Sequence, residues 1–315
     1  MGQQESDSLP EGLEFVNVTA LSDLKSLWSK IAKVEARAQD GSTRLFFLKT
    51  ASGDSAKAMF EGEFEGMVAI HEASSTGFAP KPIAWGEFRD LPGRYFFLEE
   101  FVEMADDGTL PDPEDLASKL AQMHKSSASP TGKFGFHVTT CNGTTPQKVE
   151  WEESWAAFFA RGLQLIDAIT PMFEKVVPHL LGRLQQGPNP IKHSLIHGDL
   201  WCGNTAVNKK NGATVTFDPA AFYGHNEYDL GNWRPVRNRF GKAYIDAYLR
   251  HYSPAEPKEE FDNRNLLYSM YDLLFLDSAL CILFPGEEQS VQVKKAMIED
   301  MNYLSDKYND TSKSS

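Results

Sequence analysis

The sequence predicts an α+β fold with two lobes, a small β-rich N-terminal lobe followed by a larger, mostly helical C-terminal lobe. Strand-like segments surround a single helical pattern in the first hundred residues, whereas apolar residues recur at helical spacing from about residue 111 onward. The chain has 315 residues, of which 41% are hydrophobic, and this length allows two lobes with a sizeable core.

The N-terminal lobe is predicted from alternating strand and turn signals. The segment RLFFLKT (44–50) follows the turn signal QDGS and is rich in aromatic and apolar residues, which indicates a strand. The next segment, 56–73, places Phe60, Phe64, Met67 and Val68 on one helical face. Two further strands are expected within GFAPKPIAWGEF (77–88) and in RYFFLEEFV (94–102), joined by the turn DLPG.

The C-terminal lobe is predicted from helical periodicity. PDPEDLASKLAQMH (111–124) begins with proline and acidic residues, as helix N-termini often do. Further helices are expected at 150–169, 234–252, 262–283 and 288–306. We therefore divide the chain into a disordered tail (1–12), an N-terminal lobe (13–103), a C-terminal lobe (104–308) and a second disordered tail (309–315).

Composition excludes several classes of function. The formal net charge of −13 and a pI near 5.1 argue against a nucleic-acid-binding surface, and no segment reaches the roughly 18 apolar residues of a membrane span. Three dispersed cysteines, Cys141, Cys202 and Cys281, have no zinc-site spacing and suit a reducing compartment, so a cytoplasmic location is expected. The start MGQQES fits the N-myristoylation pattern at Gly2, but without a second anchor a solvated tail is preferred.

The segment HGDLWCGN (197–204) carries the strongest functional signal. Asp199 is followed five positions later by Asn204 and nineteen positions later by Asp218, in the order of a kinase-type phosphoryl-transfer site. In such a site the first aspartate receives the proton of the attacking hydroxyl, and the asparagine and second aspartate hold Mg²⁺. Mg²⁺ is a hard cation that prefers oxygen ligands, which an amide and a carboxylate supply. The HGD segment or the FDP segment around Asp218 would more often be a simple turn if it occurred alone. Their joint order and spacing favour the phosphoryl-transfer site.

A kinase-type site also needs a cation and a place for the nucleotide base. Lys49, at the end of FFLK, is expected to contact the α- and β-phosphates, with Glu63 as its partner on the following helix and Glu61 and Glu65 as rivals. The backbone from Glu100 to Val102 is expected to meet the adenine edge. No GxGxxG or GxxxxGK[ST] sequence is present, and the segment assigned to the phosphate loop reads KIAKVEARAQDGS (30–42).

These segments together resemble the fructosamine-3-kinase family, also called ketosamine or protein-ribulosamine 3-kinases, whose fold is protein-kinase-like and shared with aminoglycoside and choline phosphotransferases. The resemblance covers nearly all of residues 28–306 and depends mainly on HGDLWCGN and FDPAAFYGHNEYDLG, supported by FFLK, MFEGEFEGM, APKPI, KFGFHVTTCNGTTPQ and WEESWAAFFARGLQL. The chain departs from the family where a glycine-rich loop with a cysteine is typical, because it reads AKVEARAQ there.

The resemblance implies an ATP- and Mg²⁺-dependent phosphotransferase that acts on an alcohol group. Its acceptor would be the O3 hydroxyl of a fructosamine or ribulosamine on lysine, either free or protein-bound, which is a deglycation repair activity. Asp199 would be the base and Asn204 and Asp218 the Mg²⁺ ligands. The substrate would meet four side chains, which are Trp201, Tyr223, His225 and Glu227.

Several alternatives stay open. Tyr223, His225 and Glu227 could instead pack and cap the loop after Asp218, and His197 is expected to brace the catalytic loop. The machinery could also serve a small-molecule alcohol kinase or, given the missing glycines, a nucleotide-binding pseudokinase, although the four residues Lys49, Asp199, Asn204 and Asp218 are all retained. The sequence predicts no oligomeric state.

Overall fold

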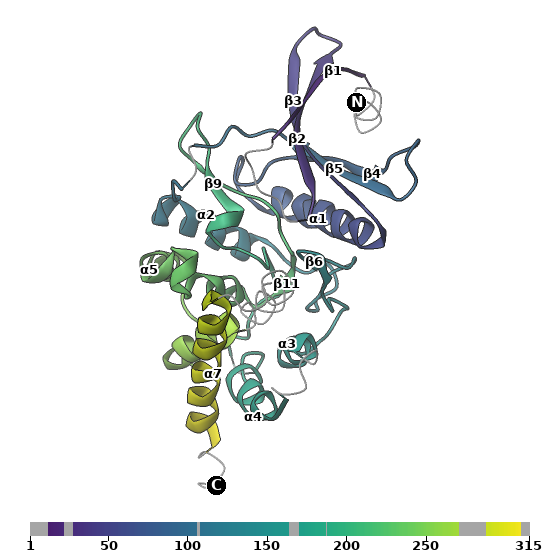
Figure 1. Cartoon of the computed structure of the whole chain (residues 1–315). Helices are drawn as coiled ribbons and strands as arrows, with labels where there is room; N and C mark the ends of the chain where they lie inside the picture. The colour runs from purple at the N-terminus through teal and green to yellow at the C-terminus, as the bar shows by residue number, and fades with distance from the viewer. Residues whose placement is uncertain are drawn as a thin grey trace.

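The fold has two lobes, the smaller built on an antiparallel sheet and the larger mostly helical (Figure 1). It is described from a computed structural model, which covers residues 12–21, 28–105, 108–163, 170–186, 188–270 and 288–309. No helix in these ranges is long and apolar enough to span a membrane. The predicted tails at 1–12 and 309–315, and with them Gly2, lie almost wholly outside the described residues.

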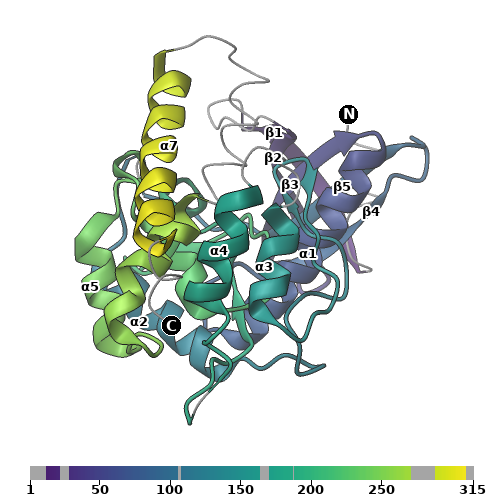
Figure 2. The ribbon, with the colours of Figure 1, turned by 90° about the horizontal axis from the view of Figure 1, so that it is seen from below.

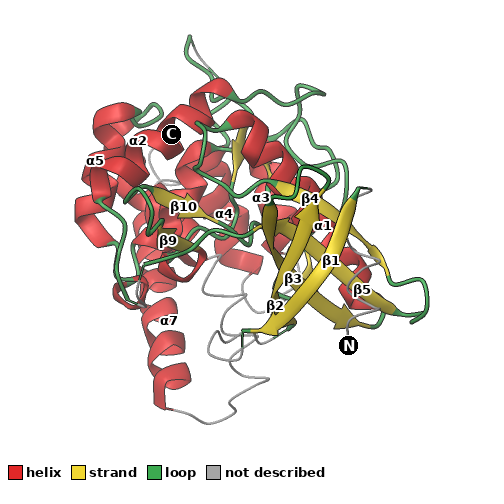
Figure 3. Ribbon diagram, turned by 90° about the horizontal axis from the view of Figure 1, so that it is seen from above, coloured by secondary structure: helices red, strands yellow, loops and turns green. Residues whose placement is uncertain are grey.

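The N-terminal lobe is a five-stranded sheet of order β1-β2-β3-β5-β4 with one long helix, α1, packed against it (Figure 3). Every neighbouring pair is antiparallel. Its elements are β1 (Leu13–Ala20), β2 (Lys30–Ala38), β3 (Thr43–Ser52), α1 (Asp54–Ala73), β4 (Pro82–Glu87) and β5 (Arg94–Glu100). The side chains of Val34, Leu48 and Leu98 form a small core on one face of the sheet, and Phe97 joins the main core on the other.

The prediction missed β1 and β2. The segment 30–42 is not a phosphate loop, because residues 30–38 pair along their length with both β1 and β3, and Gly41 turns the hairpin with a φ of +80°. The alternation in KIAKVEARA does mark a strand, but its inward residues include small alanines that give little apolar signal. The connection between β1 and β2 is 21–29, of which 22–27 lie outside the described residues.

The C-terminal lobe consists mainly of helices packed pairwise (Figure 2). Its core contains fully buried aromatic residues. Helix α2 packs against α5, and α4 packs against both α3 and α7. Its helices are α2 (Pro113–Ser126), α3 (Trp155–Leu163), α4 (Thr170–Leu181), α5 (Gly241–His251) and α7 (Glu288–Asn309), with residues 261–270 also helical. Short 3₁₀ turns lie at Cys202–Asn204, Asn226–Trp233, Val236–Asn238 and Lys258–Glu260.

Helix boundaries follow local chemistry that periodicity did not fully capture. The predicted start of α2 is confirmed, because Asp112 caps it by accepting hydrogen bonds from the backbone N–H groups of Glu114 and Asp115. Helix α3 begins at Trp155 rather than at 150, because Glu152 pairs with Phe134 in a β-bridge. Helix α5 begins at Gly241 rather than at 234, because the chain reverses at Arg239, whose φ is +62°.

Three short two-stranded ladders lie in the C-terminal lobe, and two of them flank the segment 197–204. Strand β8 (Ser194–Ile196) pairs with β11 (Phe222–Gly224), β9 (Thr205–Val207) with β10 (Thr214–Thr216), and β6 (Cys141–Asn142) with β7 (Thr145–Pro146). The residues that connect β5 to α2 bond to the β9–β10 hairpin, because Ala105 N–H donates to the carbonyl of Val207 at 2.8 Å and Lys209 N–H donates to that of Glu103 at 2.8 Å. The predicted lobe boundary, between residues 103 and 104, falls in this connection.

Candidate active site

The catalytic loop is held between two ladders. Residues 197–204 leave β8 and enter β9, and residues 217–221 leave β10 and enter β11, so the two connections lie side by side. Ala220 N–H donates to the carbonyl of His197 at 3.0 Å. Gly198 has a φ of +81°, and a Cβ there would lie 2.2 Å from the carbonyl oxygen of Ala220. Only glycine fits at this crossing.

His197 braces the loop, as predicted. Its Nε2 lies 3.0 Å from the carbonyl oxygen of Phe217, and its Nδ1 accepts a 3.3 Å hydrogen bond from the backbone N–H of Asp199. Nε2 is therefore the protonated nitrogen. Burial lowers the pKa of His197, which favours this neutral form.

Asp229 holds the backbone of the catalytic loop, and the sequence analysis did not identify this residue. Its two carboxyl oxygens accept 2.8 Å hydrogen bonds from the backbone N–H groups of His197 and Gly198. Oδ2 also lies 3.1 Å from Nε2 of His124, whose Nδ1 lies 2.7 Å from the hydroxyl of Tyr248. These groups are all buried, so the network fixes the backbone that carries Asp199.

Asp199 and Asn204 face each other across the loop. The Asn204 amide Nδ2 donates to both the backbone carbonyl and the Oδ2 atom of Asp199, each at 2.8 Å. This contact orients the carboxylate and leaves Oδ1 of both residues for other partners. Burial, together with the nearby carboxylates of Asp218 and Asp229, raises the pKa of Asp199 to about 7.

Asp218 follows β10 by two residues and meets Lys49 from the other lobe. Its φ is +56°, a left-handed conformation that aspartate tolerates better than most residues. Lys49 Nζ donates to Oδ1 of Asp218 and to Oε1 of Glu63, the latter at 2.5 Å. The structure therefore brings Lys49, Glu63 and Asp218 together, and it pairs the lysine with Glu63 rather than with Glu61 or Glu65.

One lysine faces more negative charge than it can neutralise. Burial opposes the charge on Lys49, but Asp218 and Glu63 outweigh this effect and raise its pKa. Burial and then Asp218 raise the pKa of Glu63 to about 7, although Lys49 acts in the opposite direction. A third carboxyl group, Glu99 on β5, is also buried near this lysine and was missed in the sequence.

The predicted base-binding segment lies at the end of β5. Glu100 is the last residue of the strand, and its backbone N–H donates to the carbonyl of Lys81 at 2.9 Å. The next residue, Phe101, donates its N–H to the carbonyl of Leu45 at 3.1 Å. Val102 lies in the connection that follows, half-buried between the two lobes. The assignment of Glu100 and Val102 to adenine binding stays a prediction.

The predicted substrate residues divide into two groups, of which Trp201 and Tyr223 keep solvent access. Trp201 is 38% exposed, and its ring covers Gly203 so closely that a Cβ there would lie 2.3 Å from a ring atom. Tyr223 is half-buried and stacked on Trp151, with 6.2 Å between ring centroids. Both side chains present aromatic surface that a ligand can reach.

His225 and Glu227 are corrected, because the structure buries both completely. Glu227 makes a two-point ion pair with Arg264, at 2.7 and 3.0 Å, and also accepts from the N–H of Ala255. His225 Nδ1 lies 2.8 Å from the hydroxyl of Tyr268, and burial lowers its pKa to about 4. This geometry matches the alternative reading, in which both side chains pack beneath the loop rather than contact a substrate.

The donor set for a divalent cation fits Mg²⁺. The Nδ2 atom of Asn204 donates to Asp199, so the amide oxygen of Asn204 points away from that contact. The carboxylate of Asp218 is exposed, and one of its oxygens accepts from Lys49. Among the described residues, no cluster of three or more His, Cys, Asp or Glu side chains forms an all-protein metal cage. One amide oxygen and one carboxylate suit Mg²⁺, which usually keeps waters and substrate phosphates as its remaining ligands.

Comparison with known proteins identifies the family. The family model described as fructosamine kinase matches residues 30–301. The chain belongs to the fructosamine kinase family. It is 34% identical over 254 residues to the chloroplastic protein-ribulosamine 3-kinase of Arabidopsis thaliana, an alignment that covers 73% of this chain and 69% of that relative. It is 31% identical over 267 residues to the ketosamine-3-kinase of Mus musculus, covering 72% and 80% of the two chains.

Solved structures show that this fructosamine kinase family member has a two-lobed, protein-kinase-like fold. A putative fructosamine-3-kinase from Thermobifida fusca superposes with a TM-score of 0.67 at 22% identity, covering 93% of this chain and 94% of the other. The aminoglycoside phosphotransferase APH(4)-Ia superposes with a TM-score of 0.57 at 15% identity, covering 93% and 94%. Family membership makes the chain a phosphotransferase that acts on a hydroxyl group.

Two glycines of α1 were also missed and couple the helix to the catalytic lobe. A Cβ on Gly62 would lie 2.5 Å from the carbonyl oxygen of Thr139, and a Cβ on Gly66 would lie 3.1 Å from the Cβ of Ala221. Because glycines four residues apart share one helix face, this face of α1 approaches two C-terminal segments closely. The signal was present in the segment GEFEG, within a helix where glycine otherwise costs stability.

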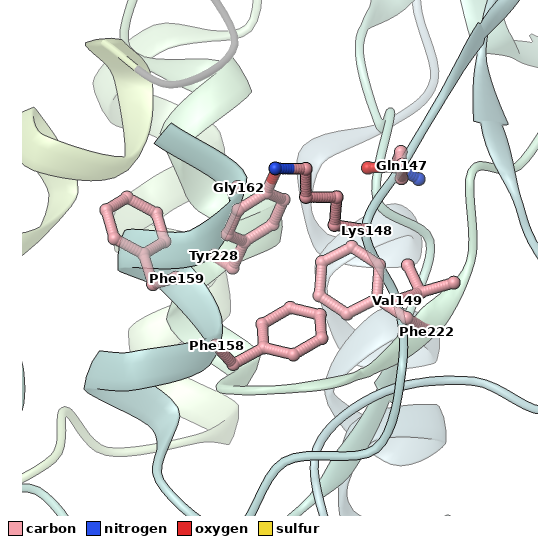
Figure 4. Close-up of a pocket in the computed structure, with 8 residues that line it drawn as sticks. All are labelled: Gln147, Lys148, Val149, Phe158, Phe159, Gly162, Phe222 and Tyr228. Atoms are coloured by element: carbon pink, nitrogen blue, oxygen red, sulfur yellow. The ribbon is translucent and has the colours of Figure 1, made fainter. Parts of the chain in front are cut away.

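The small cavity in Figure 4 is separate from this site. It lies between α3 and the 147–149 segment and is lined mainly by Phe158, Phe159, Phe222 and Tyr228. Its volume of about 10 Å³ holds at most one water molecule. None of the predicted catalytic residues lines it.

Proposed function

We propose that this chain is an ATP- and Mg²⁺-dependent kinase of sugar-derived ketoamines, which phosphorylates the O3 hydroxyl of a fructosamine or ribulosamine on lysine. The observation that carries the proposal is the convergence of Lys49, Asp199, Asn204 and Asp218 from both lobes. The plant relative is a protein-ribulosamine 3-kinase and the mouse relative a ketosamine-3-kinase, which supports the substrate class. Loss of the phosphorylated sugar would then restore the free amine.

In this proposal Asp199 receives the proton of the acceptor hydroxyl. Its Oδ2 accepts from Asn204, so Oδ1 is the oxygen that faces the acceptor. As the new bond forms between the acceptor oxygen and the γ-phosphorus, the bond to the β-phosphate oxygen breaks and ADP leaves. The raised pKa of Asp199 makes it a better proton acceptor than an exposed aspartate.

Lys49, Asn204 and Asp218 would hold the nucleotide. Lys49 supplies positive charge to the α- and β-phosphates, and Glu63 fixes the lysine side chain in place. Asn204 and Asp218 would bind Mg²⁺, which neutralises phosphate charge when bound. Glu100 and Val102 would meet the adenine edge through their backbone groups.

Trp201 and Tyr223 would form aromatic walls for the acceptor. Trp201 is two residues from Asp199 and exposed, so a sugar ring placed against it would lie beside the base. A cytoplasmic location is part of the proposal and is supported by the free, dispersed thiols of Cys141 and Cys202.

The test is a substrate panel. Purified protein is incubated with ATP and Mg²⁺ together with fructosyl-lysine, ribulosyl-lysine, choline and an aminoglycoside, and ADP release is measured with phosphorylated products identified by mass spectrometry. We expect turnover on the two ketoamines far above that on the others. Turnover on choline or the aminoglycoside alone would make the chain an alcohol kinase of another kind, and nucleotide binding without any turnover would make it a pseudokinase.

A further inference from the structure

Glu99 is a buried carboxyl group that the site described above does not use. The residue is 4% exposed, and its Oε2 atom is buried without a hydrogen-bond partner in the described part of the chain. Lys49, which acts on it electrostatically, donates its hydrogen bonds to Glu63 and Asp218 instead. An unsatisfied buried carboxyl oxygen is costly, so its retention in a strand core calls for a functional explanation.

The sheet register places Glu99 beside Lys49 on one face. Glu99 pairs directly with Phe47 across β3 and β5, and the next pair on the same face is Lys49 with Phe97. Successive pairs on one face are separated by two residues, or about 7 Å along the strands. Lys49 Nζ lies 6.0 Å from the ring centroid of Phe47, which confirms that these side chains share a face.

This face carries apolar side chains between Lys49 and the connection between the lobes, next to Lys33 and Glu35, which pair with each other at 3.5 Å. Ile31 and Phe47 are half-buried on it, and Leu45, two residues farther along β3, is 39% exposed. Backbone bonds between the 103–105 connection and the β9–β10 hairpin close its far end. Apolar side chains such as Phe47 beside Lys49 suit the planar base of a nucleotide whose phosphates would lie at Lys49.

We propose that Glu99 determines the base specificity of the nucleotide site by accepting a hydrogen bond from the amino group at position six of adenine. The inference rests on the proposed ATP binding. Adenine presents a donor at this position, whereas guanine presents an acceptor. A carboxylate oxygen of Glu99 would accept a hydrogen bond from the adenine amino group. The same oxygen would be repelled by the O6 atom of guanine.

The surroundings of Glu99 favour this role in either protonation state. Burial raises the pKa of Glu99, an effect that Lys49 opposes and that Glu63, Asp218 and Glu100 reinforce. A carboxylate accepts from the amino group, and a neutral carboxyl group can in addition donate to N7, as the amide of glutamine does when it pairs with adenine. Both forms can therefore accept from the six-amino group, and the ionised form, which Lys49 favours, also excludes guanine because it has no proton to donate to O6.

The test measures nucleotide binding in the absence of the ketoamine substrate. Isothermal titration with Mg²⁺ and ATP, GTP or purine riboside triphosphate, which lacks the six-amino group, is carried out on the wild type, Glu99→Gln and Glu99→Met. We expect the wild type to bind ATP at least about tenfold more tightly than either other nucleotide, the value of one charge-assisted hydrogen bond. Glu99→Gln should keep the preference for ATP over purine riboside triphosphate because it keeps an acceptor oxygen, and Glu99→Met should reduce that preference to less than about threefold.

Each alternative result overturns the inference. If Glu99→Met weakens all three nucleotides equally, Glu99 only positions Lys49, and if it changes none of them, Glu99 does not meet the base. If Glu99→Met fails to fold, Glu99→Gln and the wild type still decide, because a wild-type preference for ATP over purine riboside triphosphate below about threefold contradicts the proposed contact. A wild type that binds none of the nucleotides would refute the kinase proposal as well, whereas ATP binding without ketoamine turnover would leave the Glu99 inference standing.

Discussion

Lys49 Nζ lies 2.5 Å from Glu63 Oε1, and both side chains are buried although they are fourteen positions apart in the chain. The lysine belongs to β3 and the glutamate to α1, so their ion pair fixes the helix relative to the sheet. The same lysine also contacts Asp218 of the other lobe. One cation thus links the sheet, the helix and the loop that carries the proposed metal ligand.

Glu63→Gln should weaken catalysis because it removes the charge that holds Lys49 in place. We expect kcat/KM to fall by about tenfold to a hundredfold, the value of a hydrogen bond to a charged group. Glu65→Gln is the matched control on the same helix, since Glu65 pairs with the half-exposed His137 and not with Lys49. Equal losses in the two variants would contradict the assigned pairing.

Asp199→Asn should bind ATP normally but lose turnover, because it removes the proton acceptor while keeping the shape of the side chain. Loss of one such group typically lowers the rate by a factor on the order of 10²–10⁴. Thermal shift with ATP and Mg²⁺ reports binding, and single-turnover assays report the chemical step. A variant that kept more than half of the wild-type kcat would show that Asp199 is not the base.

Asp218→Asn should raise the Mg²⁺ concentration needed for half-maximal activity, because a neutral amide is a weaker ligand for a hard cation than a carboxylate. The measurement is a Mg²⁺ titration of ATP turnover at saturating acceptor. Asp246→Asn, which changes an exposed carboxylate paired with Lys242 on α5, serves as the control. An unchanged titration in Asp218→Asn would move the ligand role to another residue.

The sequence predicts the parts of the site whose spacing reflects local chemistry. HGDLWCGN and FDP each form one connection between short strands, so Asp199, Asn204 and Asp218 could be assigned from their order, and Lys49 from its strand. Glu99 and Asp229 could not, because their importance depends on what the sheet register and the buried network place beside them. For the same reason the sequence did not distinguish Tyr223, which is half-buried, from His225 and Glu227, which are fully buried within a few residues of it.

Buried His225 should make stability depend on pH. Its pKa is lowered from 6.5 to about 4, first by burial, so the unfolded chain binds a proton in this range that the folded chain does not. Its contribution to stability is present above pH 6.5 and is lost as the pH falls toward 4. Relative to His225→Asn, the wild type should lose roughly 1.4 kcal/mol per pH unit in that window.

Urea denaturation of both proteins at pH 7.5, 6.5, 5.5 and 4.5 measures this difference. Glu227, Arg264 and Tyr268 surround the position in both proteins, so the comparison isolates the effect of the imidazole. A stability difference between the two proteins that stayed constant across the four pH values would contradict the assignment.

Trp201→Ala should raise KM for the ketoamine and leave KM for ATP nearly constant. The indole is 38% exposed, lies two residues from Asp199 and is supported underneath by Gly203, so it presents a fixed aromatic face to the acceptor. Loss of that face removes about 1–3 kcal/mol of apolar burial, or roughly tenfold to a hundredfold in KM. Tyr303→Ala, an exposed aromatic residue on α7, is the control for a general loss of surface aromatic area. A rise in KM for ATP equal to that for the ketoamine would place Trp201 against the nucleotide, and unchanged values for both would remove it from the acceptor site.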